Sequence, residues 1–455
     1  MSATITRKLQ LAVLLGFGLL YIFLTPPFKA PDEISHLLRA YSVAEGQWLI
    51  KNHPTKLLRF YLANAERWQE NAPKLHRYLQ NLLDHSSGGD RVPQLVFNTS
   101  LYSPVPYLLH ALVIKCFMVC GNSNLLLLLY AMRICSLLIF IALLWLSFRL
   151  FPAGAWCVFW VAATPMALSQ ASVINLDYLL FSATAVLLAA SLGNAGPRLY
   201  ALCVIASMIL LMTAKLPYLP LLLVPAAALV LRKNHRRWPG LIVGMIVALA
   251  GGGWWNYLVK TEGIFDHSLE LARQLFQINI HLDPFKQLSF IISSPWRYLQ
   301  VLLTTFSTHG LQFFHQLVGV LGELDTPIPP AAVMLWVLGA LVLIFVREES
   351  PGFNRKDSFL LGSCCLVAAG ATLLTVLTSA FMIWMPVGSS WINVQGRYFH
   401  PVMIAFLMGM ILINPLTVGN RSGVMIRYGL LFTVVMIHGL ALSALVHRYG
   451  IWWCG

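Results

Sequence analysis

The sequence predicts an all-α polytopic membrane protein, because its composition and the lengths of its apolar runs both suit a lipid surrounding. Of its 455 residues, 58% are hydrophobic and only 11% are charged, and the mean hydropathy is +0.72. A soluble protein carries roughly 25% charged residues to cover its surface. Runs such as Leu125–Leu146 and Ile426–Ala444 approach or exceed the roughly 17–25 apolar residues that cross a bilayer. The chain is therefore expected to be solvated by lipid.

The first apolar run, Leu9–Thr25, could be a signal peptide or a spanning helix. It follows Arg7 and Lys8, as a signal peptide would. However, Phe28-Lys29-Ala30 is not a small-x-small cleavage site, and Pro31 comes directly after it. We therefore expect an uncleaved first span within residues 1–25.

The net charge of +14 does not indicate a nucleic-acid partner. The clearest basic cluster, Arg232–Arg237, lies between two apolar runs and not on a soluble face with interleaved aromatics. Such a cluster is typical of a cytoplasmic loop. The eight cysteines show no metal-ligand spacing, and Cys364 and Cys365 are adjacent within an apolar run. We expect the cysteines to act as small apolar residues in helices.

The distribution of Lys and Arg gives the orientation, since short cytoplasmic loops are enriched in both. The N-terminus and the segments Arg232–Arg237, Arg347–Lys356 and Arg421–Arg427 are expected to be cytoplasmic. Besides the first span, spans are predicted near residues 125–148, 177–193, 199–213, 216–231, 239–257, 331–346, 359–383, 400–415 and 425–446, with one more between Arg149 and the Gln170–Asp177 turn. This gives about eleven spanning helices, a cytoplasmic N-terminus and an extracytoplasmic C-terminus.

This orientation requires that the short run Val105–Val119 does not cross, because a crossing there would invert every later loop. The run opens with prolines and carries Lys115, so we expect an interfacial or re-entrant helix. The expected organisation is a first span (1–25), an extracytoplasmic loop with interfacial helices (26–124), a spanning bundle (125–257), a second extracytoplasmic loop (258–330) and a C-terminal spanning bundle (331–455).

The acidic residues are unevenly distributed. Of the 17 Asp and Glu, seven lie in residues 26–103, six in 258–330 and three in the short segment 348–357. Only Asp177 lies elsewhere, between apolar segments. The two long loops therefore hold most of the carboxylates that could support chemistry.

The first loop opens with a cluster of ionisable residues. Pro31 and Gly46 suit the start and stop of a helix over Pro31–Glu45, which would place Asp32, His36 and Arg39 on one face, with Glu33 one residue round. The acids could simply favour the helix N-terminus electrostatically. Alternatively, they could act as a general base or metal ligand at the level of a lipid headgroup, and two acids with a histidine favour this reading.

Three further ionisable residues are expected on the same membrane face. Asp177 could cap the next span or be functional, as an acid at a span end often is. Lys215 and Arg397 could be snorkelling interfacial cations. As a pair facing the carboxylates, they would suit a lipid phosphate.

The sequence allows more than one role for Arg133 and for Asp325. Arg133 lies well inside its span, where an unpaired charge costs roughly 2.5–3.5 kcal/mol. Its partner could be structural, Asp177 or a buried lipid phosphate. Asp325 could be a turn or cap residue, or could contribute to an acceptor site. His281, His309 and His315 are too scattered for metal-ligand geometry to be claimed.

Three motifs follow one another along the chain. They are Pro-Asp-Glu-x-x-His at 31–36, Gly322-Glu323-Leu324-Asp325 before Pro327 and Pro329, and Val394-Gln395-Gly396-Arg397-Tyr398-Phe399. In this order they resemble a thinly characterised family of bacterial predicted membrane proteins grouped with the GT-C glycosyltransferases, from about residue 20 to 415. The resemblance implies a GT-C-like bundle in which an acid of the first outer loop, here Asp32 or Glu33, is a base or metal ligand. In the oligosaccharyltransferase branch, an acid of the next outer loop also helps to hold a divalent metal such as Mg or Mn, and Asp177 matches it by position. The first loop has no Asp-x-Asp motif, which leaves metal dependence open.

The expected function is transfer of a monosaccharide from a polyprenyl-phosphate donor to a surface glycan, such as lipid-linked O-antigen, on the periplasmic face of a bacterial inner membrane. Asp32 is the expected base, Glu33 and His36 would position it or bind metal, and Lys215, Arg397 or a divalent ion would stabilise the departing phosphate. Arg39, Arg133 and Asp325 are further candidates for substrate binding. A single displacement would invert the anomeric centre. A transporter or flippase of a lipid-linked glycan is the main alternative, and a non-catalytic assembly subunit is a third.

Overall fold

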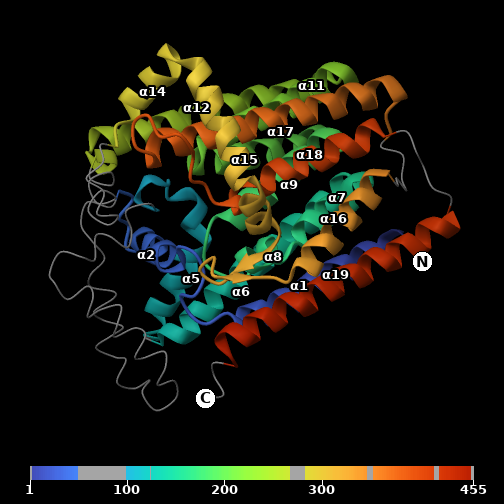
Figure 1. Ribbon diagram of the computed structural model, residues 1–455, viewed down its shortest axis with the longest axis horizontal. Helices are drawn as coiled ribbons and strands as arrows, with labels where there is room; N and C mark the ends of the chain where they lie inside the picture. The colour runs from blue at the N-terminus through green and yellow to red at the C-terminus, as the bar shows by residue number, and fades with distance from the viewer. Residues whose placement is uncertain are drawn as a thin grey trace.

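The computed structural model describes residues 3–49, 99–122, 124–266, 282–345, 352–414 and 420–451. These segments are almost entirely helical (Figure 1). The N-terminal half contains helices α1 (Ala3–Leu24), α2 (Glu33–Ala44), α5 (Leu108–Val119), α6 (Leu125–Leu150), α7 (Ala155–Ala162), α8 (Pro165–Ala171), α9 (Asp177–Leu192) and α10 (Pro197–Ala214). The C-terminal half contains α11 (Leu223–Arg232), α12 (Trp238–Thr261), α14 (Pro284–Ser293), α15 (Pro295–Gly319), α16 (Pro330–Phe345), α17 (Arg355–Trp384), α18 (His400–Ile413) and α19 (Asn420–Tyr449).

Short 3₁₀ helices and one small hairpin complete the described structure. The 3₁₀ helices are η3 (Thr99–Leu101), η4 (Val105–Tyr107), η5 (Pro152–Gly154), η6 (Leu216–Leu222), η7 (His235–Arg237) and η8 (Gly396–Phe399). Strands β1 (Val320–Leu321) and β2 (Thr326–Pro327) pair antiparallel, with Val320 opposite Pro327 and Leu321 opposite Thr326.

The helices confirm a polytopic helical membrane protein. Within the described part of the chain, seven helices are long and apolar enough to cross a membrane, and five shorter apolar helices accompany them. Four of the shorter ones lie within predicted spans: η5 with α7, α9, η6 with α11, and α16. The fifth is Val105–Val119, which exists as a helix, and its interfacial placement remains a prediction.

One predicted span is divided into two helices. The break between α7 and α8 lies at Thr164 and Pro165, because proline supplies no backbone N–H for the hydrogen bond that would continue the helix. The Thr164 hydroxyl instead caps α8 by accepting a hydrogen bond from the Ala167 N–H at 3.1 Å. The chain can therefore change direction between the two half-helices.

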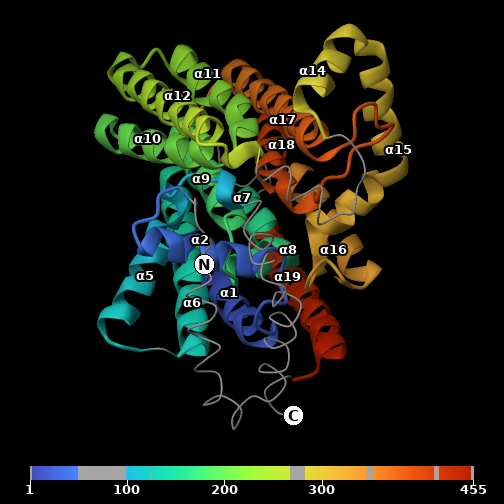
Figure 2. The ribbon, with the colours of Figure 1, turned by 90° about the vertical axis from the view of Figure 1, so that its left-hand side faces the viewer.

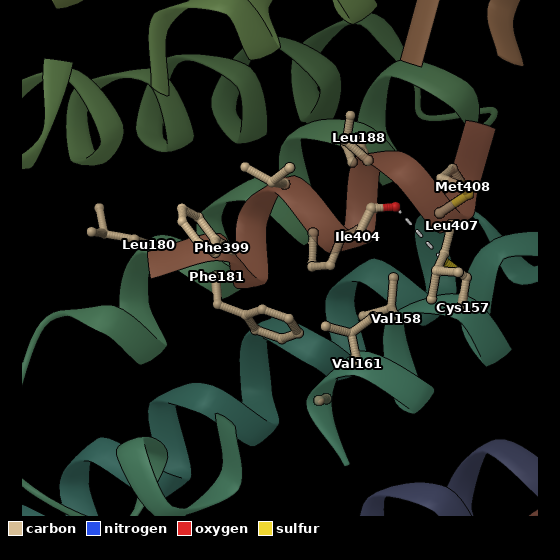
Figure 3. Packing of buried hydrophobic residues seen from close by; sticks show 14 of the residues in the cluster. Cys157, Val158, Val161, Leu180, Phe181, Leu188, Phe399, Ile404, Leu407 and Met408 are labelled. Atoms are coloured by element: carbon tan, nitrogen blue, oxygen red, sulfur yellow. Dashed lines mark hydrogen bonds between the residues drawn. The ribbon is translucent and has the colours of Figure 1, made fainter. Parts of the chain in front are cut away.

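Helix α9 lies at the centre of the bundle, and all of its residues after Asp177 are buried. It packs against α6, α8, α10, α11 and α18 (Figures 1 and 2). Figure 3 shows how Phe181 of α9, Val161 of α7 and Ile404 of α18 fill the space between these helices. The buried Cys157 thiol donates to the Ile404 carbonyl at 3.7 Å, so this cysteine packs as a small apolar residue.

The segments on either side of the bundle differ from simple polar loops. In the first, α2 occupies most of the predicted helix over Pro31–Glu45, and Gly46 ends it with a φ of 81°. Residues 50–98 lie outside the described structure. In the second, expected as a loop over 258–330, the described residues form α14, α15 and the β1–β2 hairpin.

Candidate functional site

Four ionisable side chains from four separate segments meet at one end of the bundle. Lys215 Nζ lies 3.0 Å from Asp177 Oδ1, and the Arg397 guanidinium contacts Asp32 Oδ2 at 2.5 Å and Asp177 Oδ2 at 3.4 Å. We call Asp32, Asp177, Lys215 and Arg397 the ion cluster. It contains two carboxylates and two cations, so its formal charge is balanced.

The order of the helices explains why these residues meet. Helix α1 ends just before Asp32, α9 begins at Asp177, α10 ends just before Lys215, and η8 leads into α18 at Arg397. Neighbouring helices run in opposite directions, so these four chain positions fall at the same end. The charge-based topology places all four on one membrane face, which agrees with this arrangement. Which side of the membrane that end faces stays a prediction.

Asp32 is the most accessible carboxylate of the ion cluster. Its side chain is 29% exposed, whereas that of Asp177 is 10% exposed and that of Arg397 only 1%. The Asp32 backbone has a φ of 62°, in the left-handed region that only Gly, Asn and Asp adopt routinely. This conformation places Asp32 before the first turn of α2 and turns its carboxylate toward Arg397.

Glu33 forms a buried ion pair with Arg133. Its fully buried carboxylate accepts hydrogen bonds at 2.7 Å from Arg133 Nε and from Arg133 Nη2, and others from the Phe28 and Ile174 backbone N–H groups at 2.9 and 3.3 Å. Its two oxygens are thus engaged by four donors. These contacts support a structural role for Glu33 in a buried ion pair, and its expected role in catalysis or metal binding stays a prediction.

Arg133 joins the start of the outer segment to the bundle. Its partner is Glu33, and neither Asp177 nor a phosphate is needed to satisfy it. Its remaining donors bind the carbonyls of Ile22 and Thr25 at 2.9 and 2.8 Å and that of Pro26 at 3.1 Å. These carbonyls lie at the end of α1, where the helix leaves them without internal partners. Arg133 is therefore a structural residue.

Arg39 is likewise structural in this arrangement. It is fully buried, and its Nη2 donates to the Trp48 and Tyr102 carbonyls at 2.9 and 3.0 Å. It holds the chain after α2 against the segment that carries Tyr102. The expectation that Arg39 binds substrate has no support from these contacts.

His36 lies beside the ion cluster in a buried position. Its Nδ1 is 2.8 Å from the Tyr107 hydroxyl. Burial lowers the pKa of His36 to about 4, against the opposing effect of the negative charges of Asp32 and Asp177. The ring is therefore neutral near pH 7 and suits a positioning role better than charge stabilisation.

The lowered pKa predicts a dependence of stability on pH. Between pH 6.5 and about 4, the unfolded chain protonates His36 while the folded protein does not, so stability falls as pH falls. From pH 6.5 to 5 this residue should remove about 2 kcal/mol of unfolding free energy. We expect His36→Gln to show a correspondingly flatter loss of thermal stability in detergent over this range. Parallel curves for the two proteins would contradict the prediction.

Neighbouring polar residues fix Arg397. Its guanidinium donates to Gln170 Oε1 at 3.0 Å and to Gln395 Oε1 at 2.6 Å, and its backbone carbonyl lies 2.8 Å from His400 Nδ1. Gly396 packs so closely on the Phe313 carbonyl that a Cβ atom there would collide with it. The Arg397 head group is thus held from several directions.

Aromatic rings surround the Lys215 ammonium. It lies 3.7 Å from the ring centroid of Tyr398 and 5.9 Å from that of Tyr102. Burial alone would lower the pKa of Lys215, but Asp177 and the two tyrosines outweigh it and raise the pKa above its usual value. Lys215 is therefore a permanent cation.

Sequence reasoning missed Gln170, Tyr102 and Tyr398 as members of this site. Gln170 opens the turn that ends at Asp177, and its side chain also accepts from Asn175 Nδ2 at 2.7 Å. Tyr398 follows Arg397 within the third motif. Tyr398 adjoins the predicted Arg397, and that adjacency is the signal that could have found it, whereas Gln170 lies seven residues before Asp177 and no local pattern indicates it.

The described residues hold no set of three or more His, Cys, Asp or Glu side chains that could ligate a metal. The two accessible carboxylates, Asp32 and Asp177, both face the Arg397 guanidinium, which occupies the place where a shared cation would bind. The contacts of Asp177 are with cations, and its metal role stays a prediction.

Asp325 lies outside the ion cluster, in the turn between β1 and β2. Its carboxylate accepts hydrogen bonds from Arg448 at 2.8 Å and from the Tyr449 and Thr326 hydroxyls at 2.9 Å each. Burial alone would raise the pKa of Asp325, but these hydrogen bonds lower it. The turn role is the one that its contacts support, and a contribution to an acceptor site stays a prediction.

Comparison with known proteins places the chain in a family. No curated protein matches its sequence. Two similar solved structures are ArnT from Cupriavidus metallidurans bound to undecaprenyl phosphate and the same protein in the apo state, each 14% identical. The alignment with the first structure covers 99% of this chain and 77% of the ArnT chain, with a TM-score of 0.38. The alignment with the second covers 97% of this chain and 78% of the ArnT chain, with a TM-score of 0.34. The family model described as "Predicted membrane protein (DUF2142)" matches residues 15–406, and the chain accordingly belongs to the DUF2142 family of predicted membrane proteins.

Proposed function

We propose that this protein is a glycosyltransferase that moves a monosaccharide from a polyprenyl-phosphate carrier to a glycan acceptor. The observation that carries the proposal is the ion cluster at the end of a membrane bundle, in which the partly exposed Asp32 contacts Arg397 and Asp177 holds both Arg397 and Lys215. A lipid-carried donor needs this combination, because its phosphate requires positive charge and its acceptor requires a base. We place this end of the bundle on the periplasmic face of a bacterial inner membrane, where lipid carriers and not nucleotide sugars supply the donor.

The two cations would receive the donor phosphate. Lys215 and Arg397 are already held in position by aromatic rings and by the Gln170 and Gln395 side chains. Donors fixed in advance stabilise developing negative charge without reorganisation. A phosphate would compete with Asp32 for Arg397, while Asp177 would continue to hold both cations.

Asp32 would then act as the base. In a single displacement, the acceptor hydroxyl oxygen forms a bond to the anomeric carbon as the bond from that carbon to the phosphate oxygen breaks. Asp32 takes the hydroxyl proton, and the polyprenyl phosphate leaves with the bonding electron pair. Attack from the opposite face inverts the anomeric centre. Lipid-linked O-antigen is one acceptor of suitable chemistry.

A lipid-carrier flippase remains the second candidate, because one observation favours it. The α7–α8 break and the 3₁₀ segment η6 interrupt two otherwise apolar helical regions, and discontinuous helices are common in transporters. The break at Thr164 lies close to the site, since its hydroxyl is 3.1 Å from His400 Nε2. The candidates differ in whether a glycosidic bond is made.

Reconstitution tests the proposal directly. The purified protein in liposomes would be offered synthetic polyprenyl-phosphate hexoses and lipid-linked glycans, with transfer followed by mass spectrometry. Formation of a glycosylated acceptor supports the transferase. Movement of the lipid across the bilayer without a new glycosidic bond supports the flippase and contradicts the proposal.

Lys215 gives a quantitative prediction within that assay. A hydrogen bond to a charged group is worth about 1.5–3 kcal/mol, so Lys215→Met should raise the KM for the donor about 10- to 100-fold. Lys286→Met is the matched control, since Lys286 is exposed on α14 and its ammonium lies 3.6 Å from Asp283. A donor KM that is the same in both variants would remove Lys215 from phosphate binding.

A further inference from the structure

Helix α15 presents three different faces along its first half. One face, formed by Tyr298, Val301 and Thr305, is buried against the bundle. The opposite face is apolar and exposed. It consists of Trp296, Leu299, Leu303 and Phe306, at spacings of three and four residues. A polar exposed arc lies between these faces and is formed by Arg297, Gln300, Thr304, Ser307 and Thr308.

Helix α14 repeats the pattern. Its exposed apolar stripe consists of Phe285, Leu288 and Ile292, again three and four residues apart. Gln287, on the other side, is fully buried and fixes the helix to the bundle by donating to the Phe381 and Pro386 carbonyls at 3.2 and 2.9 Å. Both helices are thus anchored by one face and expose large apolar side chains on another.

The exposed stripe continues the outer surface of a spanning helix. Helix α12 exposes Ile246 in its middle and Trp254 and Tyr257 toward its end, the order expected from acyl chains to headgroups. Lys260, one turn further, lies 5.0 Å from the ring centroid of Phe285 at the start of α14. The apolar surface therefore runs from α12 onto α14 through this cation–π contact.

The orientation of α15 suits a position at a membrane boundary. In Figure 1, α15 runs across the direction of α12 and α17, and in Figure 2 α14 and α15 lie along one side of the bundle. A helix in the membrane plane needs its apolar face toward the acyl chains and its polar face toward water. The described residues from 282 to 319 contain one acid, Asp283, and two basic residues, Lys286 and Arg297, which suits anionic headgroups.

We propose that α14 and α15 lie in the plane of the bilayer, at the end of the bundle that carries the ion cluster, with their apolar stripes inserted among lipid acyl chains. The occupant of this surface is membrane lipid and not a protein partner, because the stripe is continuous with the lipid-facing surface of α12. Exposed apolar side chains are exceptional in water but are expected in lipid. This proposal does not depend on the transferase activity.

The proposed position of α14 and α15 would place the ion cluster near the boundary of the bilayer. Gln316 of α15 accepts a hydrogen bond from the Gly396 N–H at 2.8 Å, and Thr305 accepts one from the Ile392 N–H at 2.9 Å. These bonds hold the segment that carries Arg397. The helix that borders the lipid thus also positions one of the two cations of the ion cluster.

A photo-crosslinking experiment tests the proposal. p-Benzoylphenylalanine would be introduced at Leu303 in the apolar stripe, at Thr304 in the polar arc and at Ile246 of α12 as the lipid-facing reference. Each full-length variant would be irradiated in nanodiscs of phosphatidylcholine and phosphatidylglycerol, and lipid adducts would be quantified by mass spectrometry. We expect the yield at Leu303 to be within about twofold of that at Ile246 and at least threefold above that at Thr304.

Two outcomes would overturn the proposal. One is a lipid yield at Leu303 no higher than at Thr304, which would place the stripe in water. The other is a dominant adduct between two copies of the chain, which would make the stripe a protein interface. Hydroxyl-radical footprinting of the unmodified protein in the same nanodiscs gives a second measurement that needs no variant. Protection of Leu303 and Phe306 comparable to that of Ile246 supports lipid contact, and strong oxidation of both rejects it.

Discussion

Replacing Arg133 with methionine should destabilise the protein by about 3–5 kcal/mol, because removal of one partner leaves a buried charge uncompensated. Arg133 and Glu33 are both fully buried, and each Glu33 oxygen accepts one Arg133 hydrogen bond at 2.7 Å. The variant would also leave the Ile22 and Thr25 carbonyls without their donor. The loss can be measured as a shift in the midpoint of thermal or denaturant unfolding in detergent micelles.

A double variant provides the matched control. Arg133→Met combined with Glu33→Gln removes both charges, so it should recover a substantial part of the stability lost in Arg133→Met alone. Asp357→Asn, at an exposed helix start, controls for the loss of a charge elsewhere. A single Arg133→Met variant within about 1 kcal/mol of wild type would show that the pair does not stabilise the fold.

Asp32→Asn should reduce glycosyl transfer by about 10²- to 10⁴-fold, the range typical for the loss of a general base. Asparagine is the informative replacement, because it matches the shape of aspartate and also tolerates the left-handed conformation at φ 62°. The fold should therefore survive while the proton acceptor is lost. The expected change is in kcat, with the donor KM altered much less, since Lys215 and Arg397 remain.

Asp357→Asn serves again as the matched substitution and should transfer sugar at the wild-type rate. Glu33→Gln separates the roles of the two adjacent acids. Its effect should appear as lost stability, with the specific activity of the folded fraction largely retained. If Asp32→Asn transferred sugar as fast as wild type, Asp32 would not be the base, and another carboxylate would have to be sought.

Much of the fold could be predicted from the sequence because membrane topology depends on simple patterns. Apolar runs mark the spans, and Lys and Arg mark the cytoplasmic loops. Parity alone then placed Asp32, Asp177, Lys215 and Arg397 on one face. Their contacts within 2.5 to 3.4 Å agree with that placement.

The buried pairing of Glu33 with Arg133 could not be predicted from the sequence. Two adjacent acids at a helix start differ in the direction in which their side chains point. That direction depends here on the left-handed backbone conformation of Asp32. The partner of Glu33 comes from α6, 100 residues further along the chain, and no local pattern indicates it. The same holds for Arg39, whose acceptors are backbone carbonyls.

The helices of the second long segment, expected as a loop over 258–330, could not be predicted from the sequence either. Its acids and prolines indicate a polar loop, whereas the structure forms two helices with exposed apolar stripes. Helix α15 mixes apolar and polar residues around its circumference, so its average hydropathy stays below that of a span. Its three faces become visible only when the bundle shows which residues it buries.

The contact between Arg133 and the end of α1 has a consequence for the order in which the protein is made. The ribosome completes α1 and Glu33 about a hundred residues before it reaches Arg133, as the sequence separations of 100 to 111 show. A nascent chain that ends before α6 would hold the Glu33 carboxylate without its Arg133 partner. Insertion of α6 would in turn place Arg133 in the membrane at a cost in free energy, unless the Glu33 carboxylate were already present to pair with it. We therefore expect the membrane insertion of α1 and α6 to be coupled, because Arg133 pairs with Glu33 and binds the carbonyls at the end of α1.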